Sequence, residues 1–217
     1  MAAIIDYDTL KSTVQSYCAR TDSTFTARMP VFVGLAEDRL YNGHGEPGEP
    51  LYSPPVRSRP MEATGTITIT DGVGALPGDY LSMRKLFRPG DDVGLTYLAP
   101  ERMAITGVSY PSGVPMHYTT EGDFLKLTPQ WSGDLTVLYY KRHPEVSATS
   151  ITGPLIVAHG LAYLEATLIE AFSFLQDGEN AVGHAAKLRG LVSGINRSAT
   201  DLRYSGPLRV RQRQWIP

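Results

Sequence analysis

The sequence predicts an α+β protein: a helical bundle, made of an N-terminal and a C-terminal helix pair, with an inserted antiparallel β module and an extended C-terminal arm. Apolar residues recur at helical spacing near both ends of the 217-residue chain and alternate with a period of two in its middle. The economical arrangement packs both helix pairs together. The expected segments are 1–42 (first helix pair), 43–60 (Pro/Gly-rich loop), 61–146 (β module), 152–198 (second helix pair) and 199–217 (arm).

The stretch from Pro154 to Gln176 has the clearest helical pattern. Apolar residues at alternating spacings of four and three predict its core face: Val157, Leu161, Leu164, Leu168, Ala171 and Leu175. A second apolar row widens that face: Ala158, Ala162, Ile169 and Phe172. A helix apolar over so much of its circumference needs cover from more than one direction. This cover comes either from the inside of a bundle or from another subunit, and we expect the second row to contact another subunit.

The other helices are predicted from caps and spacing. Asp6 to Thr9 offers capping residues for the first helix. In the second helix, Pro30 fits the first turn, and one face is predicted from Val31, Phe32, Leu35, Ala36, Arg39 and Leu40. The last helix, about 179–198, contains three glycines that weaken it and leave room for a neighbour: Gly183, Gly190 and Gly194.

Between the helix pairs lie a long loop and a run of strands. Residues 41–60 contain five prolines and three glycines, which excludes regular structure. A loop of this length is usually disordered or orders against a partner, and both explanations stay open. From Met61 the pattern alternates, and strands are predicted at 64–70, 81–87, 117–127 (a hairpin) and 134–141, with a short helix at 99–105.

The net charge of −2 hides an asymmetry along the chain. Residues 187–217 contain seven basic residues and one acidic residue, a net charge of +6, whereas residues 1–186 carry a net charge of −8. Such a basic tail indicates an anionic partner or an acidic docking surface. The single cysteine, Cys18, cannot form an internal disulfide and fits a small core position. No apolar run has the length of a membrane span, and nothing indicates secretion, so no membrane partner is expected.

Residue patterns that carry chemistry are missing. The five histidines do not have metal-ligand spacing, and no nucleophile elbow, phosphate-binding loop or dinucleotide fingerprint occurs. We expect no metal, no cofactor and no catalytic residue. A hydrolase would need a carboxylate pair, for which Asp79, Glu121 and Asp123 are the candidates, but each lies in an apparent turn where acids are common for conformational reasons.

The C-terminal arm is the sharpest local feature. Arg209, Arg211 and Arg213 alternate with other residues, so an extended chain presents all three on one side. Such a strand can pair with a sheet edge or follow phosphates; a disordered solubilising end is the alternative. The candidate docking residues are Tyr204, Leu208, Arg209, Arg211, Arg213 and Trp215. A nucleic-acid- or carbohydrate-binding module would instead stack ligands on rings such as Trp131, Tyr139 and Tyr140.

The order of these segments resembles the head-to-tail adaptor (connector) proteins of short-tailed bacteriophages. The matching pieces are 6–10 (DYDTL), 28–40 (RMPVFVGLAEDRL), 61–64 (MEAT), 76–81 (LPGDYL), 138–142 (LYYKR) and 174–177 (FLQD). Each piece is weak alone, and their order and spacing carry the resemblance.

The resemblance implies a structural virion protein rather than an enzyme. Proteins of this family form rings, typically dodecameric, that dock beneath the portal protein of a filled head and present a platform for a nozzle or tail-tube protein, while genomic DNA passes through the channel. The expected location is the head-tail junction of the virion, with assembly in the host cytoplasm. Another tail structural component is the alternative.

Overall fold

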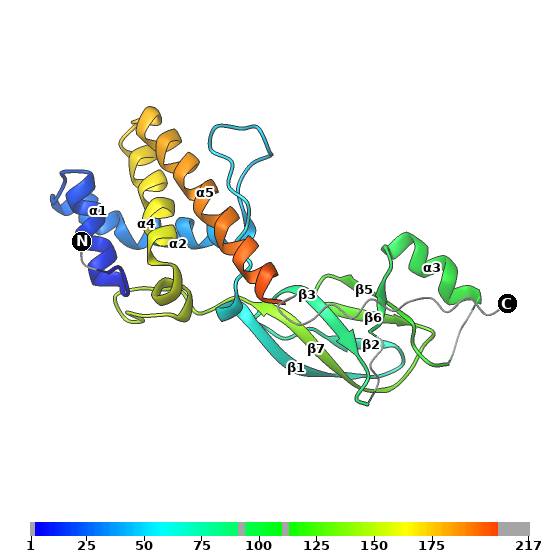
Figure 1. The fold of residues 1–217 in the computed structure, drawn as a ribbon. Coiled ribbons are helices and arrows are strands. Elements are labelled where there is room, and N and C mark those ends of the chain that lie inside the picture. Colours follow the sequence, from blue (N-terminus) through cyan, green and yellow to red (C-terminus); the bar gives the residue numbers. More distant parts are fainter. Residues whose placement is uncertain (1–2, 91–93, 110–112, 204–217) are drawn as a thin grey trace. The chain divides into compact units, whose positions relative to one another are not determined.

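The computed structural model describes residues 3–90, 94–109 and 113–203. The chain divides into two compact units, which we call the helical unit (residues 1–60 and 144–217) and the β unit (residues 61–143). Within the described residues, five α-helices and two β-sheets form an α+β fold (Figure 1). The predicted α+β class is confirmed.

Four helices build the helical unit: α1 (Tyr7–Tyr17), α2 (Ser23–Asn42), α4 (Pro154–Phe174) and α5 (Gly178–Arg203). The Asp6 carboxylate caps α1 by accepting the Thr9 N–H at 2.8 Å. Asp22 caps α2 in the same way, accepting the Phe25 N–H at 3.0 Å. Because this cap starts α2 at Ser23, Pro30 lies inside the helix, and its predicted place in the first turn is wrong.

Helix α4 is the centre of the helical unit. It packs against α1, α2 and α5, and it lies between α1 and α5 in Figure 1. Every residue from Ala162 to Ile169 is buried, which includes the charged Glu165. By length and composition α4 could also cross a membrane, but 67% of its most apolar 18-residue window is buried inside the protein, as in ordinary core helices.

The first turns of α4 are out of phase with the rest. His159 has non-helical backbone angles (φ −136°, ψ 43°) and divides α4 into two segments. Before this break Leu155 and Ile156 face the core, whereas Val157 is 56% exposed. Leu161, just after the break, is 51% exposed. The prediction that Val157 and Leu161 belong to the core face is wrong. For Val157 the reason is that a single helical period does not run through the break.

Two further features differ from the prediction: the width of the buried face of α2 and the C-terminal end of α5. On α2, Val31 and Leu35 are about half exposed (50% and 51%), while Phe32, Ala36 and Leu40 are buried. The buried face is therefore narrower than the apolar pattern predicts. Helix α5 continues to Arg203, so residues 199–203 are helical rather than part of an extended arm.

The β unit contains two sheets. A short 3₁₀ turn, η1 (Arg59–Met61), leads into β1 (Glu62–Ile69), which pairs with β7 (Gly133–Lys141), and β7 pairs with β3 (Tyr80–Phe87); both pairings are antiparallel. The second sheet has the order β2 (Val73–Ala75), β6 (Phe124–Thr128), β5 (His117–Glu121) and β4 (Thr96–Tyr97). Side chains of both sheets form one core: Ile67, Ile69, Leu86, Tyr118, Leu125, Leu127, Leu135, Val137 and Tyr139.

The sequence predicts a purely antiparallel β module, but the β unit also contains a parallel strand pair. Strand β4 pairs with β5 in parallel. The chain between them forms α3 (Pro100–Ser109), which packs against β5 and β6. A helical crossover brings the second of two neighbouring strands back in the same direction as the first, so the short helix predicted at 99–105 accounts for this parallel pair.

Candidate assembly surface

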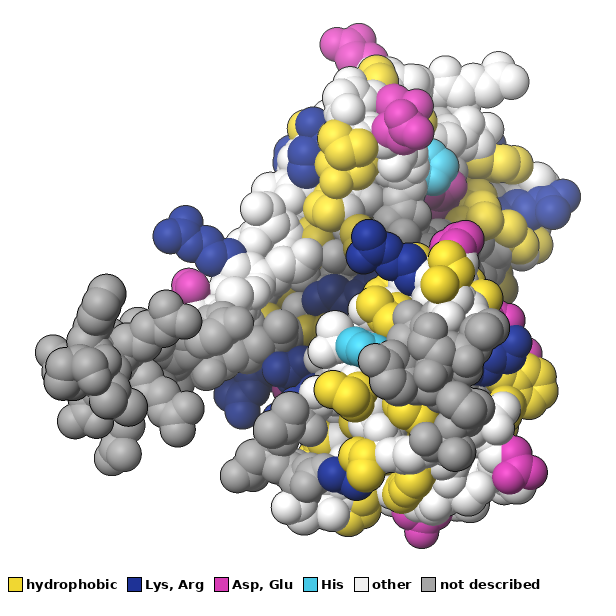
Figure 2. Space-filling view, turned by 90° about the vertical axis from the view of Figure 1, so that its right-hand side faces the viewer, with side chains coloured by type: hydrophobic (Ala, Val, Ile, Leu, Met, Phe, Trp, Pro, Cys, Tyr) yellow, Lys and Arg dark blue, Asp and Glu magenta, His cyan; other side chains and the backbone are white. Residues whose placement is uncertain are grey.

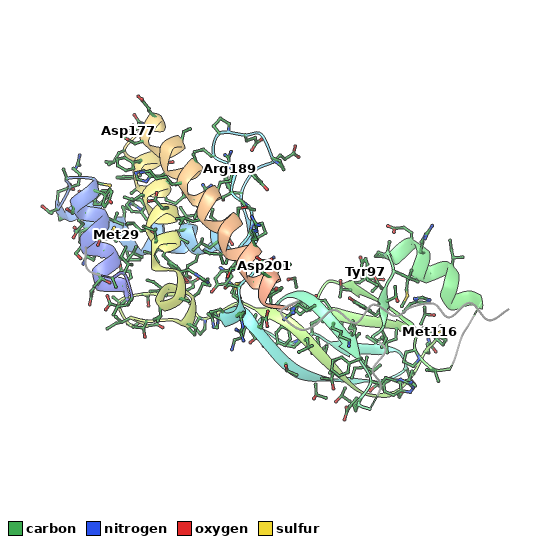
Figure 3. All side chains as sticks on the ribbon, in the orientation of Figure 1. Met29, Tyr97, Met116, Asp177, Arg189 and Asp201 are labelled. Atoms are coloured by element: carbon green, nitrogen blue, oxygen red, sulfur yellow. The ribbon has the colours of Figure 1, made fainter. Side chains whose placement is uncertain are left out.

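The Pro/Gly-rich loop is held by the helices of its own unit. The Arg39 guanidinium on α2 donates to Glu170 Oε1 at 2.8 and 2.9 Å and to the Leu51 carbonyl at 2.9 Å. Arg189 on α5, labelled in Figure 3, donates to loop carbonyls, including that of Tyr52 at 3.3 Å, and its guanidinium lies over the Tyr52 ring. The loop is thus ordered against its own chain.

The base of the loop is fixed to α5 as well. The Arg57 N–H donates to Asn196 Oδ1 at 2.7 Å, and the Asn196 amide donates to the Pro55 carbonyl at 2.9 Å. His44 and Ser53 exchange backbone hydrogen bonds, which closes the stem of the loop. Beyond this stem lies the segment 45–50, which we call the loop tip; the carbonyls of Glu49 and Pro50 at its end also accept from Arg189, at 3.3 and 3.4 Å.

The loop tip is acidic and exposed. Glu49 folds back, and its carboxylate accepts the Glu46 N–H at 3.1 Å. The Glu46 side chain is exposed and makes no ion pair among the described residues. Gly45 and Gly48 have positive φ angles (67° and 112°), which only glycine adopts readily, so the turn depends on them.

A surface pocket of about 410 Å³ lies in the helical unit near the break in α4. Its lining comes from the segment before β1 and from α4 and α5: Ser58, Arg59, Pro60, Ala158, His159, Gly194, Ile195, Ser198 and Ala199. Ser58 is 2% exposed, and its Oγ has no hydrogen-bond partner; Nε2 of His159 is unpaired too. Burial lowers the pKa of His159 below its usual 6.5. The pocket therefore combines apolar walls with unsatisfied polar groups.

The predicted subunit-interface row divides at the α4 break. Ala158 is exposed and lines the pocket. Ala162, Ile169 and Phe172 are 2%, 0% and 9% exposed, because α1, α2 and α5 already cover this part of α4. These three side chains are internal to the protomer, and assigning them to a subunit interface is corrected accordingly.

The helical unit nonetheless leaves large apolar side chains in contact with solvent. Those 39% to 56% exposed are Ile5, Tyr17, Val31, Leu35, Ile151, Val157, Leu161, Phe174 and Val182. Figure 2 shows hydrophobic side chains interspersed with basic and acidic ones over one face of the molecule. The sequence pattern placed several of them, including Val31, Leu35, Val157 and Leu161, on apolar helix faces, because half-exposed and buried apolar residues have the same spacing on a helix.

The family model of the SU10 adaptor protein matches residues 5–211. The chain belongs to the SU10 adaptor protein family. This membership confirms the resemblance to bacteriophage head-to-tail adaptors, and it supports a structural adaptor role at the head-tail junction of a virion, in contact with portal and tail proteins. No curated protein matches the chain.

The proposed docking arm of this adaptor lies outside the described residues, and so do Tyr204, Leu208, Arg209, Arg211, Arg213 and Trp215. The basic stretch that precedes it is visible on α5. Lys187 and Arg197 are exposed there, and Arg197 lies 3.9 Å from Asp201 in an exposed ion pair. Asp177 and Asp201 in Figure 3 mark the two ends of this helix.

Two of the three carboxylates considered for hydrolysis, Asp79 and Glu121, make separate structural contacts in the adaptor. Asp79 accepts a 2.8 Å hydrogen bond from the Tyr139 hydroxyl, and Glu121 pairs with Lys126 on the neighbouring strand. Asp123 is exposed in the β5–β6 turn. Among the described residues, no group of three or more His, Cys, Asp or Glu side chains could hold a metal ion.

Two of the rings considered for ligand stacking are core residues. Tyr139 is 6% and Tyr140 5% exposed. Tyr139 stacks on Tyr80 with ring centroids 5.9 Å apart. Trp131 is half-buried, and its ring lies against Gly133, where an added Cβ would come within 2.5 Å of it. Stacking of a base or sugar on Tyr139 or Tyr140 would require the β unit to open.

Proposed function

We propose that this adaptor forms a closed ring, typically of twelve copies, beneath the portal and joins the DNA-filled capsid to the tail. The observation that carries the proposal is the match to the adaptor family over residues 5–211. The half-exposed apolar side chains of the helical unit support it, since single chains gain free energy by covering such groups. The role is structural and requires no catalytic step.

Each part of the chain has a place in this proposal. The helices form the ring wall as a bundle, and a closed ring uses a heterologous interface in which one surface meets a different surface of the next copy. The basic arm, residues 204–217, docks on the portal protein. The β unit faces a neighbour or the nozzle or tail-tube protein, and genomic DNA passes through the central channel. Assembly takes place in the host cytoplasm.

Negative-stain imaging of the full-length adaptor mixed with its purified portal tests this function. We expect portal rings that carry an additional ring of adaptor density. Deleting residues 208–217 should abolish portal binding and leave the far-UV circular dichroism spectrum unchanged. Portals that stay bare with the full-length chain would overturn the proposal, and unchanged binding by the truncated chain would remove the docking role of the arm.

A further inference from the structure

We propose that the loop tip of one adaptor copy inserts into the α4–α5 pocket of the next copy, where Glu46 faces Arg59. The inference rests on the proposed ring and identifies the contact that closes it. None of the residues that line the pocket belongs to the loop tip. Tip and pocket are therefore different surfaces of the same unit, as a heterologous interface requires.

The pocket is incomplete in the single chain. A buried hydroxyl without a hydrogen-bond partner costs free energy, and native proteins rarely leave one in that state. Ser58 Oγ and His159 Nε2 are both unpaired at this pocket. Pro60, Ala158 and Ile195 provide apolar wall, while Gly194 adds no side chain. A fitting occupant therefore carries apolar surface together with backbone or side-chain polar groups.

The charge at the pocket rim indicates which charge a fitting occupant carries. Arg59 is exposed and forms no ion pair among the described residues. Arg57, two residues earlier, donates its guanidinium to the Tyr41 and Val56 carbonyls. An acidic occupant is favoured, and the basic arm at residues 204–217 is disfavoured.

The loop tip has the chemistry that this pocket lacks. Glu46 supplies an exposed carboxylate, and Pro47 supplies a compact apolar ring next to it. The backbone around Gly48 is open to approach by Ser58 and His159, since no heavy atom outside its two chain neighbours lies within 4 Å of the Cβ position of Gly48. The stem is already held by Arg39 and Arg189, so little ordering entropy remains to be lost on docking.

Charge reversal on both sides tests the contact. E46K, R59E and the E46K/R59E double variant are assembled on portal at several concentrations, and the fraction of portals bearing a complete adaptor ring is counted by negative stain. Each single reversal should raise the concentration needed for half-assembly by about tenfold or more, as expected for a disrupted close charge pair. The double variant should return to within about threefold of wild type. E145K, an exposed acid outside both surfaces, is the matched control and should assemble normally.

A disulfide probe gives a second readout. In a C18A background, E46C combined with R59C should produce a ladder of linked subunits on non-reducing gels of assembled rings, and neither single cysteine should do so. The contact is overturned if wild-type rings form and the single reversals assemble normally, or if the double variant does not restore assembly. The proposed function stands in both cases. If R59E prevents ring formation and E46K does not, a portal or tail segment fills the pocket, and the proposed contact is again overturned. Absence of wild-type rings removes the proposed function and the contact together.

Discussion

Arg39 on α2 and Glu170 on α4 form an ion pair in which Nε and Nη2 donate to the same carboxylate oxygen at 2.9 and 2.8 Å. The Arg39 side chain is 5% and the Glu170 side chain 16% exposed. The third donor, Nη1, reaches the Leu51 carbonyl. One guanidinium therefore joins two core helices to the Pro/Gly-rich loop, which explains how a segment with eight Pro and Gly residues in twenty is ordered within the chain.

Replacing Glu170 with Ala should destabilise the protein by about 3 kcal/mol, because it leaves the Arg39 charge buried and unpaired. Urea unfolding followed by circular dichroism measures the loss. Limited proteolysis should also cut faster within residues 43–55. Glu179→Ala, which removes an exposed carboxylate in the first turn of α5, is the control and should cost no more than about 1 kcal/mol, the contribution of an acid at a helix N-terminus. Equal effects of the two changes would contradict a structural role for the pair.

A charged substitution in α4 should impair folding when it lies after the His159 break and impair assembly when it lies before it. Ala162→Asp and Leu164→Asp put a carboxylate at positions 2% and 1% exposed, and both should unfold the helical unit, since an unpaired buried charge costs several kcal/mol. Ala158→Asp lies at the exposed pocket rim and should leave the melting temperature nearly unchanged while it blocks ring formation on portal. A folded Ala162→Asp protein would contradict the internal position of this row.

Gly160 and Gly183 should respond in opposite ways to a methyl group. At Gly160 a Cβ would lie 1.9 Å from the Ile4 carbonyl oxygen, so Gly160→Ala must displace the N-terminal segment, at a cost of about 2 kcal/mol. At Gly183 nothing lies within 4 Å, and Ala is the better helix former, so Gly183→Ala should stabilise by about 0.5 to 1 kcal/mol. Thermal unfolding of the two variants measures both signs.

The strands of the β unit could be predicted because their signal is local. Thr and Ile alternate from Thr64 to Thr70, and β1 covers most of that stretch with Ile67 and Ile69 inside. The helices were likewise found from caps and spacing, as at Asp6. The α+β class follows from such local patterns, and the family resemblance from their order.

The errors arise where distant residues decide. His159 breaks α4 although its sequence reads as one continuous apolar helix, and the Ile4 backbone lies against Gly160 beside that break. Glu165 lies within the same apolar run, where its carboxylate is 2.6 Å from Nδ1 of His184 on α5, and helical period alone does not reveal that partner. The pocket at Ser58 joins three segments far apart in the chain, so no local motif marked it.

Cys18 should react slowly with alkylating reagents. Burial raises the pKa of its thiol to about 11, so at pH 8 the thiolate fraction is about a hundredfold smaller than for an ordinary cysteine. Iodoacetamide labelling followed by mass spectrometry should therefore be slow in buffer and fast in 6 M guanidinium chloride. Cys18 is half-buried at the C-terminal end of α1 rather than in the core, and labelling in buffer at the rate of free cysteine would contradict this partial burial.

The stability of the helical unit should fall between pH 6.5 and pH 5, in part through His159. Burial lowers the pKa of this imidazole in the folded state, whereas the unfolded chain binds its proton near pH 6.5. The unfolded state then holds more protons in this window, so the free energy of unfolding decreases as the pH drops, by at most about 1.4 kcal/mol per pH unit for one group. His159→Gln removes the titration and should flatten this slope. Urea unfolding at pH 5.0, 5.75, 6.5 and 7.5 measures the slopes, and identical slopes for wild type and His159→Gln would show that His159 is as solvated in the folded chain as in the unfolded one.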